Sequence, residues 1–232
     1  TMGLTNLLGG SILARDALKD ANIALKRAKK TRRGGFVMFS AEMGSDIRER
    51  VRLLQNLRLA VESERLFIVY QPQVNLASGK LVGMEALIRW RNEDGTFVPP
   101  DRFIPLAEAS GMIVAIGDWV LRMSCHELVR LQALGYPDLR MSVNVSQVQF
   151  RHPEFLEKLN AALLDTGIQP NSLELEITES VAMEDADFML ETLHLVRELG
   201  ISIAIDDFGT GYSSLSQLRQ LPIDRLKIDR AF

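Results

Sequence analysis

The chain is poor in the features that define several large classes of protein. A single cysteine, Cys125, excludes both a disulfide framework and a thiolate metal site. The chain contains no run of about eighteen apolar residues and no signal-peptide pattern. The net charge of -3 argues against a nucleic-acid polymer as partner, since such a partner selects a basic face. We therefore expect a cytoplasmic protein, or the cytoplasmic part of a membrane-anchored one.

A pair of adjacent carboxylates is the most informative feature that is present. Asp206 and Asp207 follow the alternating apolar residues of 201–205 and precede the glycine turn at 209–211. The alternation predicts a β-strand, because side chains two residues apart share one face. Two repelling charges at a strand end favour a hard divalent cation such as Mg2+ or Mn2+ as their partner. A solvated acidic turn is the plain alternative for an isolated pair.

The other predicted strands favour the metal interpretation. Each has apolar side chains on one face and hydrogen-bonding or charged side chains on the other. The segments are 82–90 with Glu85 and Arg89, 141–146 with Asn144, 173–179 with Glu176, and 225–229 with Lys227 and Asp229. Together these faces supply several kinds of oxygen donor and one ammonium group, which is the set that a metal-assisted reaction uses.

The segments between the strands are predicted helices, because apolar residues recur in them at three- and four-residue spacing. They cover residues 103–110, 113–134, 155–164 and 188–199. Alternating strands and helices imply a parallel sheet, either a barrel or an open doubly wound sheet. The open sheet would need a glycine-rich turn after its first strand, and none follows residues 66–74, so we favour the barrel. The carboxyl ends of the strands would then form the mouth of an active site.

Several short motifs stand in the order that is typical of one family. They are Tyr70-Gln71-Pro72, Glu85-Ala86-Leu87, Asn144-Val145-Ser146, Glu176-Ile177-Thr178-Glu179, the run 206–215 and Leu226-Lys227-Ile228-Asp229. Motifs in a fixed order are far more specific than any one of them. From about Arg48 onward, roughly four-fifths of its length, the chain resembles the EAL family of cyclic di-GMP phosphodiesterases.

The resemblance implies an α/β fold of the (β/α)8 TIM-barrel type with an antiparallel first strand pair. It also implies metal-dependent hydrolysis of cyclic di-GMP, a bacterial second messenger, to linear pGpG. The cofactors would be Mg2+ or Mn2+ in a two-metal site, where paired cations activate water and stabilise the attacking and leaving oxygens. The partners implied are cyclic di-GMP itself and a second copy, in a homodimer formed through the EAL domain and its loop at 209–214.

The family's metal and catalytic roles fall on matching positions of this chain. The metal ligands would be Glu85, Asn144, Glu176, Asp206 and Asp207, with Asp206 shared between the two ions. Lys227 would hold the attacking water, and it counts as catalytic together with Glu85, Asp206 and Asp207. A non-catalytic cyclic di-GMP receptor or regulatory scaffold is the alternative function. Such relatives usually lack one of these ligands, and here all are present.

The remaining roles concern the substrate and one loop. Gln71, Arg89 and Asp229 would contact the substrate. Arg89 shares its strand face with Glu85, so its guanidinium can reach a phosphate over the same mouth, although a simple ion pair with Glu85 is the alternative. Glu179 would stabilise the loop that follows Asp207.

The first part of the chain has a different character. Residues 16–29 have apolar side chains at helical spacing, and a strand-like segment follows at 36–39. This part resembles the closing helix and strand of a GGDEF domain, and a solvated linker helix is the alternative. We expect residues 1–44 to be this small α/β remnant plus a linker, and residues 45–232 to be the EAL domain.

The expected EAL domain is incomplete. In the family, two more strand-helix units follow the strand that carries Lys227, so we expect about six of the eight barrel strands here. The upstream GGDEF domain and the rest of the barrel would then belong to a longer parent protein. We expect little or no hydrolysis from this piece alone.

Overall fold

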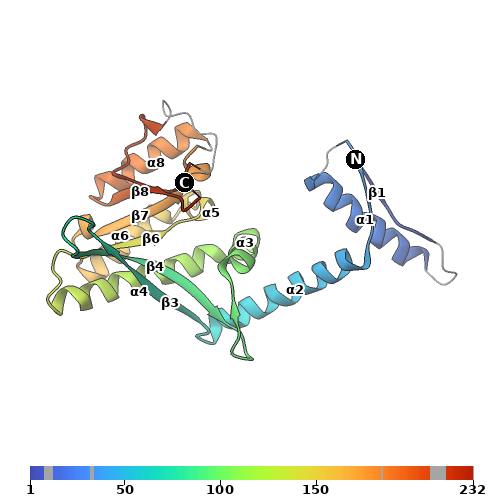
Figure 1. The fold of residues 1–232 in the computed structure, drawn as a ribbon, viewed down its shortest axis with the longest axis horizontal. Helices are drawn as coiled ribbons and strands as arrows, with labels where there is room; N and C mark the ends of the chain where they lie inside the picture. Colours follow the sequence, from blue (N-terminus) through green and yellow to red (C-terminus); the bar gives the residue numbers. More distant parts are fainter. Residues whose placement is uncertain (8–12, 32–33, 184, 210–217, 232) are drawn as a thin grey trace. The chain divides into compact units, whose positions relative to one another are not determined.

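The computed structural model of the chain describes residues 1–7, 13–31, 34–183, 185–209 and 218–231 (Figure 1). These residues form two compact units, Thr1–Leu59 and Ala60–Phe232. The long helix α2 (Ala41–Glu62) lies mostly in the first unit and ends in the second. The domain boundary expected at residues 44 and 45 falls inside this helix, and the assignment of residues 1–44 to a GGDEF domain stays a prediction.

The first unit contains a two-stranded parallel sheet with one helix against it. The strands are β1 (Met2–Leu4) and β2 (Phe36–Met38), and the helix is α1 (Ala14–Thr31). Strand β1 approaches the helix so closely that a Cβ atom on Gly3 would lie 2.1 Å from the carbonyl oxygen of Ala21. Glycine is therefore required at position 3. The helix and strand predicted at 16–29 and 36–39 are confirmed.

The second unit is built on a seven-stranded sheet. Its strands are β3 (Leu66–Val74), β4 (Leu81–Arg91), β5 (Phe97–Val98), β6 (Arg140–Asn144), β7 (Leu173–Thr178), β8 (Ser202–Phe208) and β9 (Arg225–Ile228). The order is β3-β4-β6-β7-β8-β9, with β5 paired to β4. Strand β3 is antiparallel to β4, and the strands from β4 to β9 along this order are parallel. The antiparallel first pair is confirmed.

Helices connect the parallel strands of the sheet. They are α3 (Pro100–Ser110), α4 (Met112–Ala133), α5 (Gln147–Phe150), α6 (Phe155–Thr166), α7 (Glu179–Met183) and α8 (Ala186–Glu198), with a 3-10 turn at Pro170–Ser172. The longer helices α4 and α8 pack against the sheet, and Figure 1 shows them lying along the strands. The strands bury one face, which carries apolar side chains such as Met141, Leu175 and Ile203, against these helices. Their opposite face carries the polar side chains and is available for a functional site.

The sheet curls on itself as a barrel wall does. Strands β4 and β9 are separated by three others in the sheet, yet Lys227 on β9 lies 3.0 Å from Glu85 on β4. An open doubly wound sheet would keep these strands well apart. The TIM-barrel-like fold is therefore confirmed, and the barrel is incomplete in the described part of the chain.

Among the described residues, none of the helices has by itself the length and apolar character that crossing a bilayer would require. The pair α3 and α4 meets that requirement when counted together, and the two are bent by 117° relative to one another.

Candidate active site

Three carboxylates from different strands converge on the inner face of the sheet. Glu85, Glu176 and Asp206 each offer an oxygen atom, and these atoms all lie within 4.8 Å of one another. The register explains the convergence, because Glu176 lies beside Ala204, and Asp206 is one step nearer the mouth beside Thr178. The alternation along each strand points all three side chains to the same face. The site therefore results from the polar side chains that alternate with the buried apolar ones along each strand.

A lysine ammonium stands at the centre of this cluster. Lys227 Nζ donates to Glu85 Oε2 at 3.0 Å, to Glu176 Oε2 at 2.5 Å and to Asp206 Oδ2 at 3.1 Å. An ammonium group has three donors, and all three are used here. The Glu176 side chain is fully buried, whereas Lys227 keeps 23% of its side chain exposed. One positive charge faces three carboxyl groups, so the cluster suits additional cationic charge.

Asn144 joins the cluster from the end of β6. Its Nδ2 donates to Glu85 Oε1 at 2.8 Å, and it lies beside Glu176 in the register of β6 and β7. An asparagine also carries a carbonyl oxygen, which is a ligand that hard divalent cations accept. The amide therefore adds a neutral oxygen donor to three acidic ones.

The segment after Asn144 is fixed from the helix side of the sheet. Ser146 and Gln149 form a capping box at the start of α5, in which each side chain bonds to the backbone of the other residue. The Gln149 amide lies so close to α4 that a Cβ atom on Gly117 would be 1.9 Å from its Nε2. Gly117 therefore allows the helix to approach the turn that follows β6.

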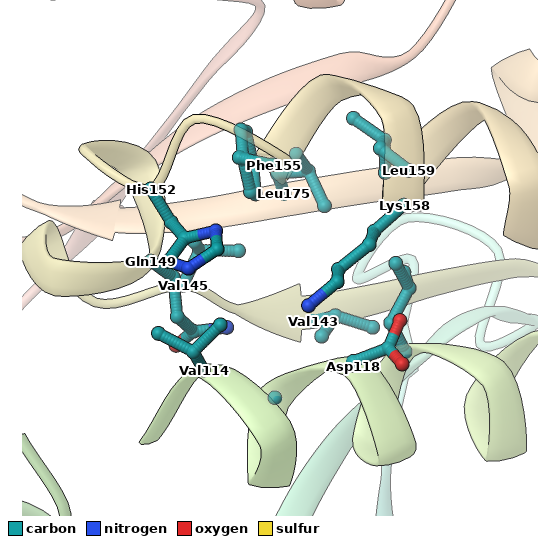
Figure 2. Close-up of a pocket in the computed structure, with 12 residues that line it drawn as sticks. Val114, Asp118, Val143, Val145, Gln149, His152, Phe155, Lys158, Leu159 and Leu175 are labelled. Carbon is teal, nitrogen blue, oxygen red and sulfur yellow. The ribbon is translucent and has the colours of Figure 1, made fainter. Parts of the chain in front are cut away.

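Figure 2 shows the pocket that adjoins this turn. It is a small cavity of about 30 Å³, lined mainly by apolar side chains such as Val143 and Leu175. Lys158 and Asp118 face one another at one end, and His152 lies at the other. Val143 and Leu175 lie on the opposite faces of β6 and β7 from Asn144 and Glu176. The pocket therefore lies behind the wall that carries the cluster and is separate from it.

Burial and charge shift the acidity of the cluster. Burial raises the pKa of Glu176 to about 7, and the Glu85 and Asp206 carboxylates add to this rise against the opposing effect of Lys227. Burial by itself would lower the pKa of Lys227, but its hydrogen bonds with Glu176 and Glu85 raise that pKa above its ordinary value. Burial, followed by the charges of Asp206 and Asp229, raises the pKa of Asp207. Glu176 is thus the carboxyl group that titrates near neutrality.

The raised pKa of Glu176 makes the stability of the metal-free protein depend on pH. This contribution is fully present below pH 4.5, the ordinary Glu value, and is lost as the pH rises through 7. At about 1.4 kcal/mol per pKa unit, a rise from 4.5 to about 7 corresponds to a loss on the order of 3 kcal/mol. Urea unfolding in EDTA at pH 5 and pH 8 measures it, with Glu176→Gln as the variant that cannot titrate. A stability difference between wild type and variant that does not fall with pH contradicts this expectation.

One buried atom in the cluster has no protein partner. Glu176 Oε1 is buried and accepts no hydrogen bond within the described residues. A buried carboxylate oxygen left in this state is costly, and a bound cation would satisfy it. The acidic group of Glu85, Glu176 and Asp206 could therefore hold a metal ion, with Asn144 beside it.

A cleft of about 500 Å³, open to solvent, lies over the cluster. Asp207 and Arg89 line it together with four of the clustered residues, Glu85, Asn144, Glu176 and Asp206. Asp207 is exposed, and its backbone is left-handed with a φ of 55°. Arg89 Nη1 donates to the carbonyl oxygen of Ile88 at 2.8 Å, and the structure does not contain the alternative ion pair between Arg89 and Glu85.

The other residues predicted for the site lie around it. Gln71 is exposed and stands opposite Glu85 in the register of β3 and β4, whereas Asp229 follows β9 and accepts a bond from Ala231 N at 2.7 Å. Neither of the two lines the described cleft. Glu179 is buried, and its Oε2 accepts from Gly209 N at 2.8 Å. The expected dimer loop at 209–214 begins at Gly209, and its remaining residues, 210–214, lie outside the described part.

Helix α3 contributes cleft residues that the motifs did not identify. Asp101 and Glu108 line the cleft, as does Phe103 between them. The sequence could have indicated these residues only by their position, because this helix follows the strand that carries Glu85 and Arg89. Segments that follow the carboxyl ends of barrel strands usually border the site. The acidic side chains add further hydrogen-bond acceptors to the lining of the cleft.

The curled parallel sheet and its cluster define a barrel protein with an acidic, lysine-containing site on the inner face of its strands. Residues 54–232 match the family described as EAL domain, and the chain belongs to that family. It is 39% identical over 232 residues to the bifunctional diguanylate cyclase/cyclic di-GMP phosphodiesterase MucR of Pseudomonas aeruginosa. It is also 39% identical over 238 residues to the cyclic di-GMP phosphodiesterase NbdA of the same organism.

These comparisons differ in how much of each protein they cover. The matches span 100% of this chain but only 34% of MucR and 30% of NbdA, so the chain corresponds to about a third of each relative. The solved PaMucR phosphodiesterase in complex with c-di-GMP is 44% identical, with a TM-score of 0.75. That match covers 78% of this chain and 73% of the solved one.

Proposed function

We propose that the domain, as part of the longer parent protein, hydrolyses one phosphodiester bond of cyclic di-GMP and releases linear pGpG, with Mg2+ or Mn2+ as cofactor. The observation that carries this proposal is the convergence of Glu85, Glu176 and Asp206 around Lys227 at the floor of an open cleft. The names of MucR and NbdA support it, because both are described as cyclic di-GMP phosphodiesterases. A receptor that only binds the nucleotide would have no use for an intact acidic cluster.

The residues divide into a metal-binding set and a substrate-binding set. Glu85, Asn144, Glu176 and Asp206 would hold one metal ion, and Asp206 with Asp207 would hold a second. Bound cations would neutralise the phosphodiester and lower the pKa of a coordinated water. The orphaned oxygen of Glu176 and the three acidic side chains make the donor set suitable for hard cations.

The chain's own side chains would orient the reactants. Lys227 Nζ lies within hydrogen-bond distance of three carboxylates and would position the attacking water through one of its donors. Arg89 lines the cleft and would bind a phosphate of the substrate, because a guanidinium matches two phosphate oxygens at once. Gln71 on β3 and Asp229 after β9 stand at the sides of the cluster and would contact the rest of the dinucleotide.

Chromatography of the products formed by the full-length parent protein tests this function. With cyclic di-GMP and Mn2+ or Mg2+, we expect pGpG as the product, no turnover in excess EDTA, and recovery when Mn2+ is restored. The variant Glu157→Gln, at an exposed position on α6, serves as a control that keeps wild-type turnover. Calorimetric binding of cyclic di-GMP without any pGpG under these conditions would instead support the receptor function and refute hydrolysis.

The proposal extends to partners. We propose a homodimer formed through this domain and, upstream in the same protein, a GGDEF domain of the kind implied by the diguanylate cyclase part of MucR's name. Sedimentation of the purified protein with and without cyclic di-GMP measures whether the homodimer forms. The cytoplasmic location expected from the sequence stays a prediction.

A further inference from the structure

A second layer of polar side chains lies directly beneath the acidic cluster. Ser142, Glu174 and Arg225 each precede a residue of the cluster by two positions, on β6, β7 and β9 respectively. Side chains two residues apart on a strand share one face. These three therefore point into the same curled interior, one step further from the mouth than Asn144 and Glu176.

Hydrogen bonds join this layer across the sheet. Ser142 Oγ donates to Glu174 Oε1 at 2.8 Å, and Arg225 Nη1 donates to the same oxygen at 3.2 Å. Gln73 Nε2 on β3 lies 3.4 Å from Ser142 Oγ and extends the chain of contacts to the edge of the sheet. Strands β3, β6, β7 and β9 are thus linked through their side chains. We call Gln73, Ser142, Glu174 and Arg225 the polar floor.

Small residues alternate with the long ones and make room for them. A Cβ atom on Gly83 would lie 2.9 Å from Gln73 Oε1, so glycine on β4 leaves space for the glutamine amide. Ala204 on β8 is fully buried and lies beside Arg225 in the register of β8 and β9. Its single methyl group lets the arginine reach over β8 to Glu174 on β7. A larger residue at position 204 would block this path.

The polar floor carries an energetic cost that the fold alone does not require. The Glu174 side chain is only 2% exposed, and its Oε2 has no hydrogen-bond partner among the described residues. Barrel interiors are usually filled by branched apolar side chains, and a buried ion pair is often no more stabilising than apolar packing. What an ion pair adds is geometry, since it accepts only one arrangement of the strands that carry it.

We propose that Glu174 and Arg225 are positioning residues for the acidic cluster. Their ion pair joins β7 to β9 across β8, and the same two strands carry Glu176 and Lys227 one layer above. The pair fixes the distance between these strands and thereby holds the carboxylate and the ammonium in register with Glu85. This inference rests on the proposed function, because it assigns the polar floor a role in metal binding and turnover.

The test compares charge-removing and charge-keeping variants of the pair. Glu174→Gln keeps the size of the side chain and an acceptor for Ser142, while Arg225→Met removes the cation. We expect each to weaken Mn2+ binding, measured by calorimetry, and to lower kcat by about 10-fold with KM for cyclic di-GMP unchanged. Arg225→Lys, which keeps the charge, should return Mn2+ affinity to within about 2-fold of wild type. The double variant Glu174→Gln/Arg225→Met should cost no more than either single variant.

An ion pair away from the site provides the matched control. Arg122 pairs with Asp118 and Asp165 on the helix side, and Arg122→Met should leave Mn2+ affinity and kcat at their wild-type values. Circular dichroism checks folding, and Arg225→Lys decides the question if Arg225→Met fails to fold. Wild-type Mn2+ affinity in Glu174→Gln, or equal losses in Arg225→Lys and Arg225→Met, would overturn the inference. If the wild type makes no pGpG, the proposed function fails, while the Mn2+ affinities still decide the role of the polar floor.

Discussion

In the full-length parent protein, the Asp206→Asn variant will hydrolyse cyclic di-GMP more than about 100-fold more slowly than the wild type, since even residues behind metal ligands cost 10- to 100-fold. Asp206 Oδ2 accepts from Lys227, and Oδ1 accepts from Asp207 N at 2.9 Å. Asparagine keeps the bond to Asp207 N but presents an N–H group to the ammonium of Lys227. It also removes the carboxylate that both metal ions would share.

The measurement is kcat in saturating Mn2+, with circular dichroism to verify the fold. Asp165→Asn makes a matched control, because Asp165 is an exposed partner of Arg122 on the helix side of the sheet. We expect that control to keep wild-type turnover. An Asp206→Asn protein that is folded and retains turnover within a few-fold of the wild type would remove Asp206 from the metal site.

Replacing Lys227 with Met should lower both the stability of the metal-free protein and its turnover. In the metal-free protein the ammonium is the cation that the three carboxylates share. Its removal leaves a buried, uncompensated cluster, which we expect to cost roughly 3–5 kcal/mol of unfolding free energy. Turnover should fall by more than about 100-fold, because the water loses its orienting donor.

Divalent cations should compensate this loss of stability. Mn2+ should raise the Tm of Lys227→Met by more degrees than it raises that of the wild type, since the metal ion no longer competes with an ammonium for the same oxygens. Thermal unfolding with and without Mn2+ measures both shifts. Lys158→Met, which breaks an ion pair with Glu154 on α6, is the control and should show the wild-type shift. A smaller Mn2+ shift in Lys227→Met than in the wild type would contradict a shared position for ammonium and metal.

The sequence located the strands and their inner faces well, because burial on one face leaves a period of two that needs no three-dimensional information. Five residues share the inner face, and hydrogen bonds from Asn144 to Glu85 and from Lys227 to the three carboxylates join them in the structure. They are Glu85, Asn144, Glu176, Asp206 and Lys227. The direction of β3 could not be predicted in this way. The alternation of apolar residues is the same whichever way a strand runs, so only the family resemblance predicted the antiparallel pair.

Local details depended on interactions that the alternation does not report. Glu179 was placed at the end of a strand, but it begins helix α7, where Thr178 Oγ1 accepts from Val181 N. Asp207 adopts a left-handed backbone that nothing in its residue type requires. The polar floor was missed although Glu174 and Arg225 share the parity of Glu176 and Lys227. Their pairing across β8 depends on register, which a single sequence does not specify.

The reversed direction of β3 decides where the polypeptide enters the barrel. In an all-parallel barrel, the segment before the first strand arrives at the floor, far from the chemistry. Here Leu66 pairs with Trp90, and Arg91 N donates to the carbonyl oxygen of Arg65 at 3.0 Å, so the chain arrives beside the carboxyl end of β4. The last turn of α2 therefore connects through three residues, 63–65, to the rim that bears Arg89. The segment that leads into the barrel is therefore anchored at the substrate side of the wall.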